Sequence, residues 1–559
     1  MTDTTGLPET TDDGKARKSA LAQLRFDDVT PTAVVEFVSR GRCLVVGPED
    51  RALQVARQAG EGLACTVACP GPGEPTAAAV DGITVVRGGR LVVTGALGDF
   101  RVSLAGESGE RNVGALLSPP VQRFDLVVDL GATPLMRQAM PPLGYYAPRD
   151  PTALDETMSV LPDMLGEFEK PKFFDYDPGI CAHGRSGKRG CTRCIDACPA
   201  EAIVSIGESV QVNPYLCQGG GACATTCPTG AITYAYPPAA DLLGLMRRAL
   251  QAYREAGGKA PLVLFHDASS SEAIGGALAA MPERVIPVPV EEVASVGMDS
   301  WLCALALGAS AVAVATSDRT PAQSLEALQD QLLTARALLA GMGYDDSGVA
   351  LVNADQPEAT LAFLAAAPAA APLPPAAFAA PSDKRGRLRL ALQHLHGHAP
   401  APKRLISLHQ GAPFGEVKVD GQKCTLCMSC VSSCPTHALQ DGRGLPQLNF
   451  REWSCVQCGL CERTCPEEAI TLSPRLLCDV EARETPRLLH EEQPLCCVSC
   501  GKPFATRSML DILERKLAGH WMFKDEQARR RLQMCEDCRV RDLFAAEARQ
   551  RQGDAGRKQ

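Results

Sequence analysis

Cysteines repeat at one spacing between residues 424 and 466. The stretch reads CTLCMSCVSSCP at residues 424–435 and CVQCGLCERTCP at residues 455–466. In each run three cysteines are separated by two residues, and a fourth follows after three more, directly before a proline. Three thiolates at this spacing wrap one face of an iron–sulfur cubane, and the fourth reaches a neighbouring cluster. The stretch therefore predicts two [4Fe–4S] clusters with crossed fourth ligands: Cys424, Cys427, Cys430 and Cys465 for one cluster, and Cys455, Cys458, Cys461 and Cys434 for the other.

Two such runs in register resemble the bacterial-type 2[4Fe–4S] ferredoxins. The resemblance extends over roughly Phe414 to Pro474. It implies a ferredoxin-like dicluster module, which we place at residues 401–475.

Composition separates cluster ligation from a disulfide scaffold. The chain has 559 residues, 25 cysteines and a formal net charge of −9. Disulfide scaffolds are small and secreted, whereas this chain is long enough for several domains and opens with polar residues that contain no apolar signal core. We therefore expect metal or cluster ligation in a reducing, cytoplasmic compartment. The best apolar run, Trp301 to Thr316, is shorter than the ~20 residues that a bilayer needs.

A second, imperfect cysteine region predicts a ferredoxin-like module at residues 179–240. It reads CTRCIDACP at residues 191–199 and CQGGGACATTCP at residues 217–228. Lys188 stands where the first run would begin with a further cysteine, and Gly220 holds the central position of the second run. An Ala-Ile pair follows each proline after two residues, as Ala469-Ile470 does in the C-terminal module, which identifies an internal repeat.

Cys181 can replace the missing first ligand from a longer, glycine-rich loop. One site is then complete for a [4Fe–4S] cluster, and we expect His183 to support that site rather than to act in catalysis. The other site keeps three thiolates, which fit a [3Fe–4S] cluster or a [4Fe–4S] cluster with a water or another fourth ligand, unless this half is empty. The predicted sets are Cys181, Cys191, Cys194 and Cys227 for the complete site, and Cys198, Cys217 and Cys223 for the incomplete one.

The N-terminal segments predict further parts of a multidomain protein of α/β and α+β class. Residues 1–30 are polar, which is typical of a disordered leader. Residues 31–135 predict a small α/β domain that includes a hairpin around Gly88-Gly89. The turn at Gly47 lacks the glycine spacing of a dinucleotide site. Residues 136–178, rich in proline and aromatic residues, indicate a connecting arm.

Residues 241–360 alternate short apolar strands with helices, which predicts βαβ units and a parallel sheet. The order of these strands and helices is similar to that of the delta-subunit domain of methyl-viologen-reducing hydrogenases. That domain holds a [2Fe–2S] cluster with several cysteines and docks to heterodisulfide-reductase-type partners. Here only Cys303 lies in the segment, so the resemblance implies docking without a cluster. The Pro/Ala-rich residues 361–400 predict a semi-rigid linker between the two halves.

Two Cys-x2-Cys knuckles predict a closed, structural zinc site in a helical tail at residues 476–559, a zinc-ribbon-like unit. Cys496 can take the place of its neighbour, and another cluster is the alternative to zinc. The predicted ligands are Cys497, Cys500, Cys535 and Cys538.

The whole chain resembles bacterial polyferredoxin-like iron–sulfur proteins, notably in CAHGRSG at residues 181–187 and CTRCIDACP at residues 191–199. The resemblance implies an electron carrier between a redox donor and an acceptor, serving molybdopterin, formate dehydrogenase or hydrogenase systems. It would hold three [4Fe–4S] clusters, or four clusters if the incomplete site is filled. The alternatives are a flavin- or nicotinamide-dependent oxidoreductase subunit and a redox-sensing regulator. The absence of a dinucleotide-binding glycine fingerprint argues against the flavin- or nicotinamide-dependent subunit. The net negative charge argues against a regulator that binds nucleic acid.

Overall fold

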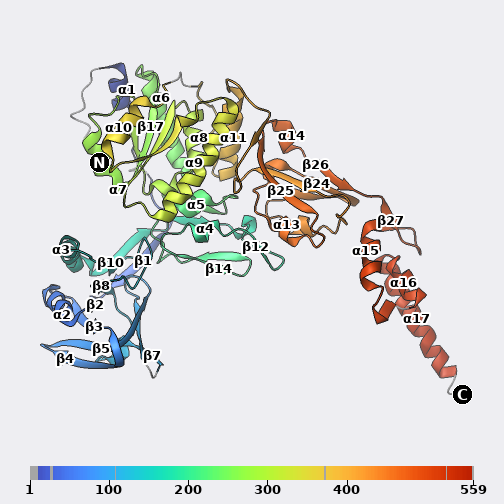
Figure 1. Cartoon of the computed structure of the whole chain (residues 1–559), viewed down its shortest axis with the longest axis horizontal. Coiled ribbons are helices and arrows are strands. Elements are labelled where there is room, and N and C mark those ends of the chain that lie inside the picture. The colour runs from blue at the N-terminus through green and yellow to red at the C-terminus, as the bar shows by residue number, and fades with distance from the viewer. Residues whose placement is uncertain are drawn as a thin grey trace.

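The computed structural model describes residues 11–25, 29–106, 109–369, 373–379, 381–523 and 525–556. Figure 1 shows that an N-terminal sheet (blue) and the C-terminal helices (red) lie at opposite ends of the molecule. The two cysteine-rich modules lie between these ends, and a four-stranded parallel sheet packs beside the first of them. The protein thus combines α/β and α+β parts.

The N-terminal sheet is mixed and has the order β7-β6-β5-β3-β2-β8-β9, with β4 paired to β5. Its central strands are apolar on both faces: Cys43 and Val45 pack under α2 (Glu49–Gln58), and Leu44 and Val46 face a second core. Such strands suit parallel pairing, because both faces are covered. The strands are β2 (Arg42–Val46), β3 (Ala64–Cys69), β4 (Gly71–Val80), β5 (Ile83–Thr94), β6 (Arg101–Gly106), β7 (Gly109–Asn112), β8 (Leu126–Asp129) and β9 (Tyr145–Tyr146).

The predicted hairpin around Gly88-Gly89 is wrong, because β5 runs through both glycines without reversing. Both glycines have positive φ, and they lie where β5 changes its antiparallel partner from β4 to β6. A side chain on Gly88 would meet the carbonyl oxygen of Glu74 in β4 at 2.8 Å. The glycines therefore serve a close approach between strands and a change of partner.

The predicted disordered leader contains a packed helix, α1 (Asp12–Leu21). Ala16 and Ala20 are fully buried against α6 (Ala239–Glu255), and Asp13 accepts a hydrogen bond of 2.6 Å from the Tyr253 hydroxyl. The polar composition concealed this helix because its buried face is formed by small residues and Arg17 rather than by large apolar side chains. Residues 1–10 and 26–28 of the predicted leader lie outside the described part.

The predicted connecting arm at residues 136–178 is also incorporated into sheets. Its β9 extends the N-terminal sheet, and the Tyr145 hydroxyl donates to Asp129 at 2.6 Å. Further along, β10 (Gly166–Pro171) pairs with β1 (Val34–Ser39), after α3 (Pro151–Val160). The last strand, β11 (Phe174–Tyr176), pairs with β16 (Ile232–Tyr234) of the first cysteine module. That module therefore begins before the predicted boundary at residue 179.

The two cysteine modules share one order of elements. In each, a strand before the first cysteine run pairs antiparallel with the strand after the second run, and a hairpin joins the two runs. The N-terminal module contains β11, the small hairpin β12 (Gly184–Arg185) and β13 (Lys188–Arg189), α4 (Arg193–Asp196), β14 (Ile203–Ile206), β15 (Ser209–Val212), α5 (Ala222–Thr226) and β16 (Ile232–Tyr234). The C-terminal module contains β22 (Gly415–Val419), α12 (Ser429–Ser432), β23 (Leu439–Gly442), β24 (Leu445–Phe450), α13 (Leu460–Thr464) and β25 (Ile470–Leu477).

The alternating segment forms the predicted parallel sheet, in the order β18-β17-β19-β20. Its strands are almost wholly apolar and buried, because helices cover them. The elements are β17 (Leu262–His266), α7 (Ala268–Ala277), β18 (Val285–Pro289), α8 (Met298–Ala306), β19 (Ala311–Thr316), α9 (Ala322–Met342), β20 (Val349–Asn353) and α10 (Pro357–Ala366).

The predicted linker at residues 361–400 is wrong for half of its length, because α10 and α11 (Lys384–Gly397) occupy its two ends. The buried leucines of α11, among them Leu388 and Leu392, pack against α8. Arg387 forms a buried ion pair of 2.8 Å with Asp299 of α8. The Pro/Ala composition ends near residue 380, and apolar residues at helical spacing follow it. The two halves are therefore joined by a docked helix rather than by a spacer.

Two further strands extend the sheets of the second module. Before it in the chain, β21 (Leu405–Ser407) pairs with β25, and after it β26 (Arg487–Glu491) pairs with β24. The tail contains α14 (Val480–Glu484), the hairpin β27 (Pro494–Cys496) and β28 (Pro503–Thr506), and the helices α15 (Arg507–Leu517), α16 (Glu526–Leu532) and α17 (Glu536–Gly556). Among the described residues, none of the helices combines the length and apolarity that a membrane crossing requires.

Candidate iron–sulfur sites

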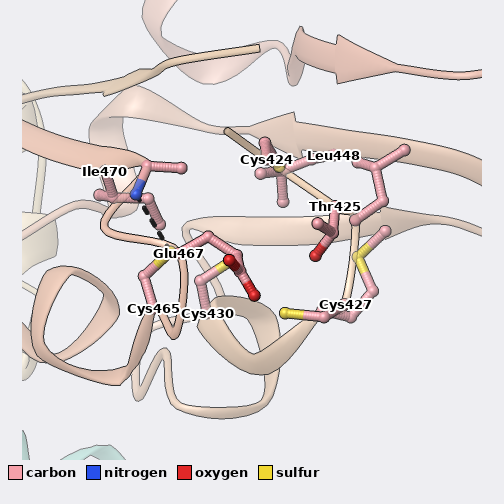
Figure 2. Close-up of a pocket in the computed structure, with 11 residues that line it drawn as sticks. Cys424, Thr425, Cys427, Cys430, Leu448, Cys465, Glu467 and Ile470 are labelled. Atoms are coloured by element: carbon pink, nitrogen blue, oxygen red, sulfur yellow. Dashed lines mark hydrogen bonds between the residues drawn. The ribbon is translucent and has the colours of Figure 1, made fainter. Parts of the chain in front are cut away.

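The C-terminal module places the first predicted ligand set around one pocket. Cys424, Cys427 and Cys430 line it from one loop, and Cys465 reaches it from the end of α13, as Figure 2 shows. The loop can wrap the pocket because Leu426 and Met428 adopt left-handed φ values of 54° and 60°. The fourth cysteine therefore comes from the other run, as the crossed arrangement requires.

The second predicted set lines a separate pocket in the same module. It is formed by Cys455, Cys458 and Cys461 of the second run and by Cys434 of the first. Gln457 and Gly459 repeat the left-handed turns, with φ values of 54° and 79°. Both pockets are lined mainly by apolar side chains, so the sulfur atoms are their principal polar ligands.

The same hydrogen bond recurs at three of the alanines that follow the Cys-Pro pairs. The backbone N–H of Ala469 donates to the sulfur of Cys465 at 3.3 Å, and that of Ala438 to Cys434 at 3.2 Å. In the N-terminal module Ala202 donates to Cys198 at 3.4 Å. The residue before each alanine has positive φ, which turns the N–H toward the sulfur. Such bonds neutralise part of the charge on a ligating thiolate and tune the potential of a cluster.

The N-terminal module also brings together its predicted four-cysteine set. Cys181 and Cys227 pack together beside Ala231, and the charges of Cys227, Cys191 and Cys181 all act on Cys194, whose pKa is raised first by burial. The long loop that carries Cys181 is fixed by a buried histidine.

That histidine is His183, which is 1% exposed. Its Nδ1 lies 2.9 Å from the carbonyl oxygen of Cys191, and its Nε2 lies 2.7 Å from the Ser205 hydroxyl. Because a carbonyl only accepts, Nδ1 carries the proton and Nε2 accepts from the serine. His183 thus has a positioning role, as the sequence indicates.

The three-cysteine set lines its own apolar pocket. Cys198, Cys217 and Cys223 surround it, together with Phe173 and Tyr234. The loop between residues 219 and 221 contains three glycines, and the central one holds the position of a fourth cysteine.

Burial gives the cysteine sets the chemistry of cluster ligands. It raises the pKa of Cys430 to about 12 and that of Cys455 to about 11. Without a cluster these two thiols would keep their protons at neutral pH, whereas bound iron supplies the positive charge that stabilises thiolates. Thiolates around apolar pockets therefore fit iron–sulfur clusters well.

Two lysines next to the N-terminal set, Lys384, which is buried, and Lys170, which is half-buried, were missed by the sequence analysis. Lys384 of α11 donates to the carbonyl oxygens of Ala224, at 3.0 Å, and Cys227, at 3.1 Å, at the end of α5. Lys170 of β10 donates to the carbonyl oxygen of Cys217 at 2.6 Å, and burial lowers its pKa to about 8. Both lie in segments predicted as linker or arm, so sequence spacing gave no signal for them.

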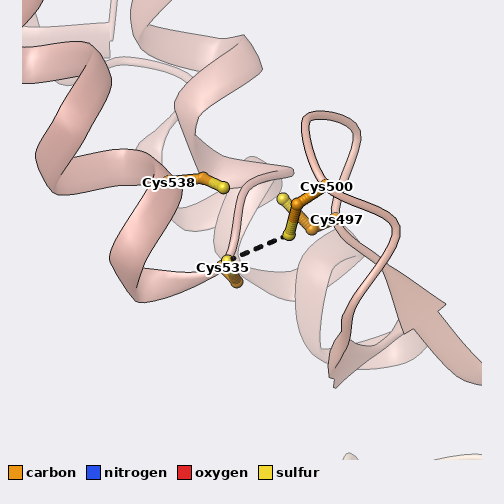
Figure 3. A group of neighbouring side chains, drawn as sticks. All are labelled: Cys497, Cys500, Cys535 and Cys538. Atoms are coloured by element: carbon orange, nitrogen blue, oxygen red, sulfur yellow. Dashed lines mark hydrogen bonds between the residues drawn. The ribbon is translucent and has the colours of Figure 1, made fainter.

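The two knuckles of the tail meet in a four-sulfur group (Figure 3). The sulfur atoms of Cys497, Cys500, Cys535 and Cys538 all lie within 4.8 Å of one another. Burial acts to raise the pKa of Cys497, but backbone N–H groups, including that of Ser499 at 3.4 Å, lower it to about 6. Four sulfurs in this arrangement fit a tetrahedral metal ion.

The alternative ligand Cys496 is exposed and lies outside that four-sulfur group. The hairpin that carries the first knuckle contacts the C-terminal module, where the Thr506 hydroxyl donates to the carbonyl oxygen of Thr425 at 3.1 Å. The hairpin of the tail is therefore attached beside the pocket of Cys424.

Comparisons with known proteins agree with this geometry. The family described as a 4Fe-4S dicluster domain matches residues 423–470, and the family described as a 4Fe-4S binding domain matches residues 210–233. The ferredoxin-type protein NapF of Escherichia coli (strain K12) is 40% identical over 53 residues, which are 9% of this chain and 31% of that protein. The pyruvate synthase subunit PorD of Thermotoga maritima is 39% identical over 54 residues, which are 10% of this chain and 52% of that protein.

The chain thus spans about a third of the length of NapF and about half of that of PorD. The matches show 4Fe-4S ferredoxin-type domains in this chain and support an electron-transfer role.

Proposed function

We propose that this protein carries electrons through a row of iron–sulfur clusters between two redox protein partners. The clusters would be held by the ligand sets predicted above: three sets of four cysteines and one set of three. The four-sulfur group of the tail would hold a structural zinc ion. When bound, each cluster accepts or releases one electron. The protein's own residues set the spacing, burial and charge around each cluster.

The observation that carries this proposal is the contact between the two modules. Gly190 directly precedes Cys191, and Leu460 follows Cys458 by two residues. A Cβ atom built on Gly190 would lie 2.7 Å from Cγ of Leu460. Nη1 of Arg463 donates to the carbonyl oxygen of Arg189 at 2.6 Å. One predicted cluster of each module therefore lies beside this contact, and the charge of Cys191 acts on the thiol of Cys458.

A second contact fixes the same two modules. Nη2 of Arg193 donates to the carbonyl oxygen of Gly411 at 2.6 Å. Arg385 of α11 lies over the rings of both Phe414 and Trp453, with its guanidinium carbon 4.8 Å and 4.7 Å from the two ring centroids. These contacts support a fixed separation between the modules, which electron transfer needs because its rate falls steeply with distance.

The exposure of the ligands suggests where a partner docks. Cys427 is exposed, whereas Cys181, Cys194 and Cys227 are buried. The cluster of Cys424, Cys427, Cys430 and Cys465 is thus a surface end of the row.

The partners we propose are other redox proteins of the cytoplasm, such as molybdopterin, formate dehydrogenase or hydrogenase-type oxidoreductases. Of the similar proteins, one is named a ferredoxin-type protein and the other a subunit of pyruvate synthase, which supports a role beside other proteins. Docking by the parallel-sheet domain remains a prediction from its resemblance to the hydrogenase delta subunit.

Anaerobic quantitation of iron, sulfide and zinc, with EPR of oxidised and reduced protein, tests the proposal. We expect roughly fifteen to sixteen irons and one zinc per chain, with no flavin absorbance. About eight irons would contradict an electron-carrying N-terminal module, and near-stoichiometric flavin would turn the carrier into an oxidoreductase subunit. Spin–spin interaction between clusters of different modules is expected in the reduced protein, and its absence would contradict the continuous row.

A further inference from the structure

The loop of the three-cysteine site keeps the backbone of a complete cluster loop. Gly219 and Gly221 have φ values of 77° and 75°, which match the left-handed turns on either side of Cys458 in the other module. A short helix begins directly after the second turn in both loops. A side chain at Gly220 would therefore leave the backbone in the direction of a ligating cysteine.

A methionine sulfur occupies the space beside this glycine. A Cβ built on Gly220 would lie 3.0 Å from Sδ of Met140, and the ring of Pro199 is the other neighbour at 3.0 Å. The backbone N–H of Met140 donates to the carbonyl oxygen of Pro199 at 3.0 Å. Because Pro199 follows Cys198, the segment that carries Met140 is tied to one of the three cysteines of the site.

We propose that Met140 supplies the fourth sulfur of this site and completes a Cys198, Cys217, Cys223 and Met140 set for a [4Fe–4S] cluster. A thioether is a soft ligand of the kind that iron–sulfur sites accept, and it binds without losing a proton. The three flexible bonds of methionine let its sulfur reach into an irregular space. The inference rests on the proposed function, because it requires a cluster at this site.

A neutral ligand changes the electrostatics of the site. With a thioether in place of one thiolate, the cluster and its ligands carry one negative charge fewer than an all-cysteine set, which favours the reduced state. Lys170, whose Nζ lies 2.6 Å from the carbonyl oxygen of Cys217, acts in the same direction. We therefore expect this cluster to have the highest reduction potential of the row.

Two substitutions in the full-length, anaerobically prepared protein test the ligand. M140L keeps the size of the side chain but offers no ligand, so it should lose about one iron per chain and gain an oxidised-state [3Fe–4S] EPR signal. M140C should keep the iron content and lower the reduction potential of one cluster, because a thiolate restores the negative charge. M136L is the matched control: Met136 belongs to the same segment but packs in the N-terminal sheet core, and its loss should change neither readout.

Several outcomes would overturn the assignment. An unchanged iron content and EPR spectrum in M140L would exclude ligation, and so would a [3Fe–4S] signal already present in the unmodified protein. If M140L does not fold or does not incorporate clusters, M140C provides the test. An unchanged reduction potential in M140C would exclude ligation by residue 140. C198S separates the two proposals: if it leaves the iron content unchanged, the site holds no cluster and this part of the proposed function fails together with the Met140 assignment.

Discussion

The two cysteine modules have the same order of strands and helices but different ligands and surroundings. In the C-terminal module all eight ligand positions hold cysteine, and Cys427 is exposed. The N-terminal module has glycine at one position, and buried Lys384 of a distant helix contacts the end of its α5. The comparison teaches that the loop conformation does not depend on all four cysteines. The surroundings of the N-terminal module can supply charge and sulfur that its own repeat lacks.

The largest effect is expected from removing a ligand in the regular module. C427S should cost the C-terminal module about four irons and slow electron transfer through the chain, while the N-terminal EPR signals remain. Iron analysis and EPR measure this. C496S is the control, because Cys496 is exposed and outside every predicted set, and it should lose no iron. If the N-terminal signals also disappear in C427S, the modules do not assemble independently and the comparison between them fails.

The four-sulfur group tests whether the C-terminal module needs its added tail. C535A should release zinc and unfold the tail around residues 494–540, because structural zinc sites contribute on the order of 10 kcal/mol to the folding of small units. Limited proteolysis and zinc analysis would show this. The clusters should stay, since no cysteine of the tail belongs to a predicted cluster set. Loss of cluster absorbance in C535A would show that the tail supports the cluster beside Thr425.

Breaking the buried ion pair of α11 should loosen the N-terminal module from its support. R387L leaves the Asp299 carboxylate buried without its partner, which should lower the free energy of unfolding by about 3–5 kcal/mol. R389A on the same helix removes a surface pair with Glu484 and should cost less than about 1 kcal/mol. Chemical denaturation compares the two variants, and equal losses would contradict the supporting role of the buried pair.

The same pair predicts a pH dependence. Burial acts to raise the pKa of Asp299, but Arg387 and Lys384 lower it below its ordinary value. A carboxylate with a lowered pKa stabilises the fold above the ordinary aspartate pKa, and this contribution is lost as the pH falls through the lowered value. R387L should therefore lose less stability between neutral and strongly acidic pH than the unmodified protein. An identical acid dependence in both proteins would contradict this assignment.

The smallest effect is expected at the contact between the modules. R463A removes the hydrogen bond to the carbonyl oxygen of Arg189, worth about 1 kcal/mol at this exposed position. Iron content should not change, but spin–spin interaction between the modules should weaken. R451A, an exposed arginine of the same module, should leave that interaction unchanged. A weaker interaction in both variants would show that the contact around Arg463 has no special role.

The sequence by itself determined the parts that depend on local spacing. Cysteine intervals of two and three residues predict the ligand sets, and the structure brings each predicted set together, although the ligands themselves remain a prediction. The parallel strands were also predictable, because runs such as Ala311–Thr316 are apolar throughout and lie between helices. In both cases the signal comes from residues that are neighbours along the chain.

Only the tertiary structure decided how these parts are joined. The composition of residues 1–30 and 361–400 predicts disorder and a linker, but α1 and α11 are packed, because their buried faces meet partners far away in the sequence. Met140 lies beside Gly220 and Lys384 beside Cys227 for the same reason. Such contacts depend on distant surfaces that become complementary only when the chain has folded, so no local pattern predicts them.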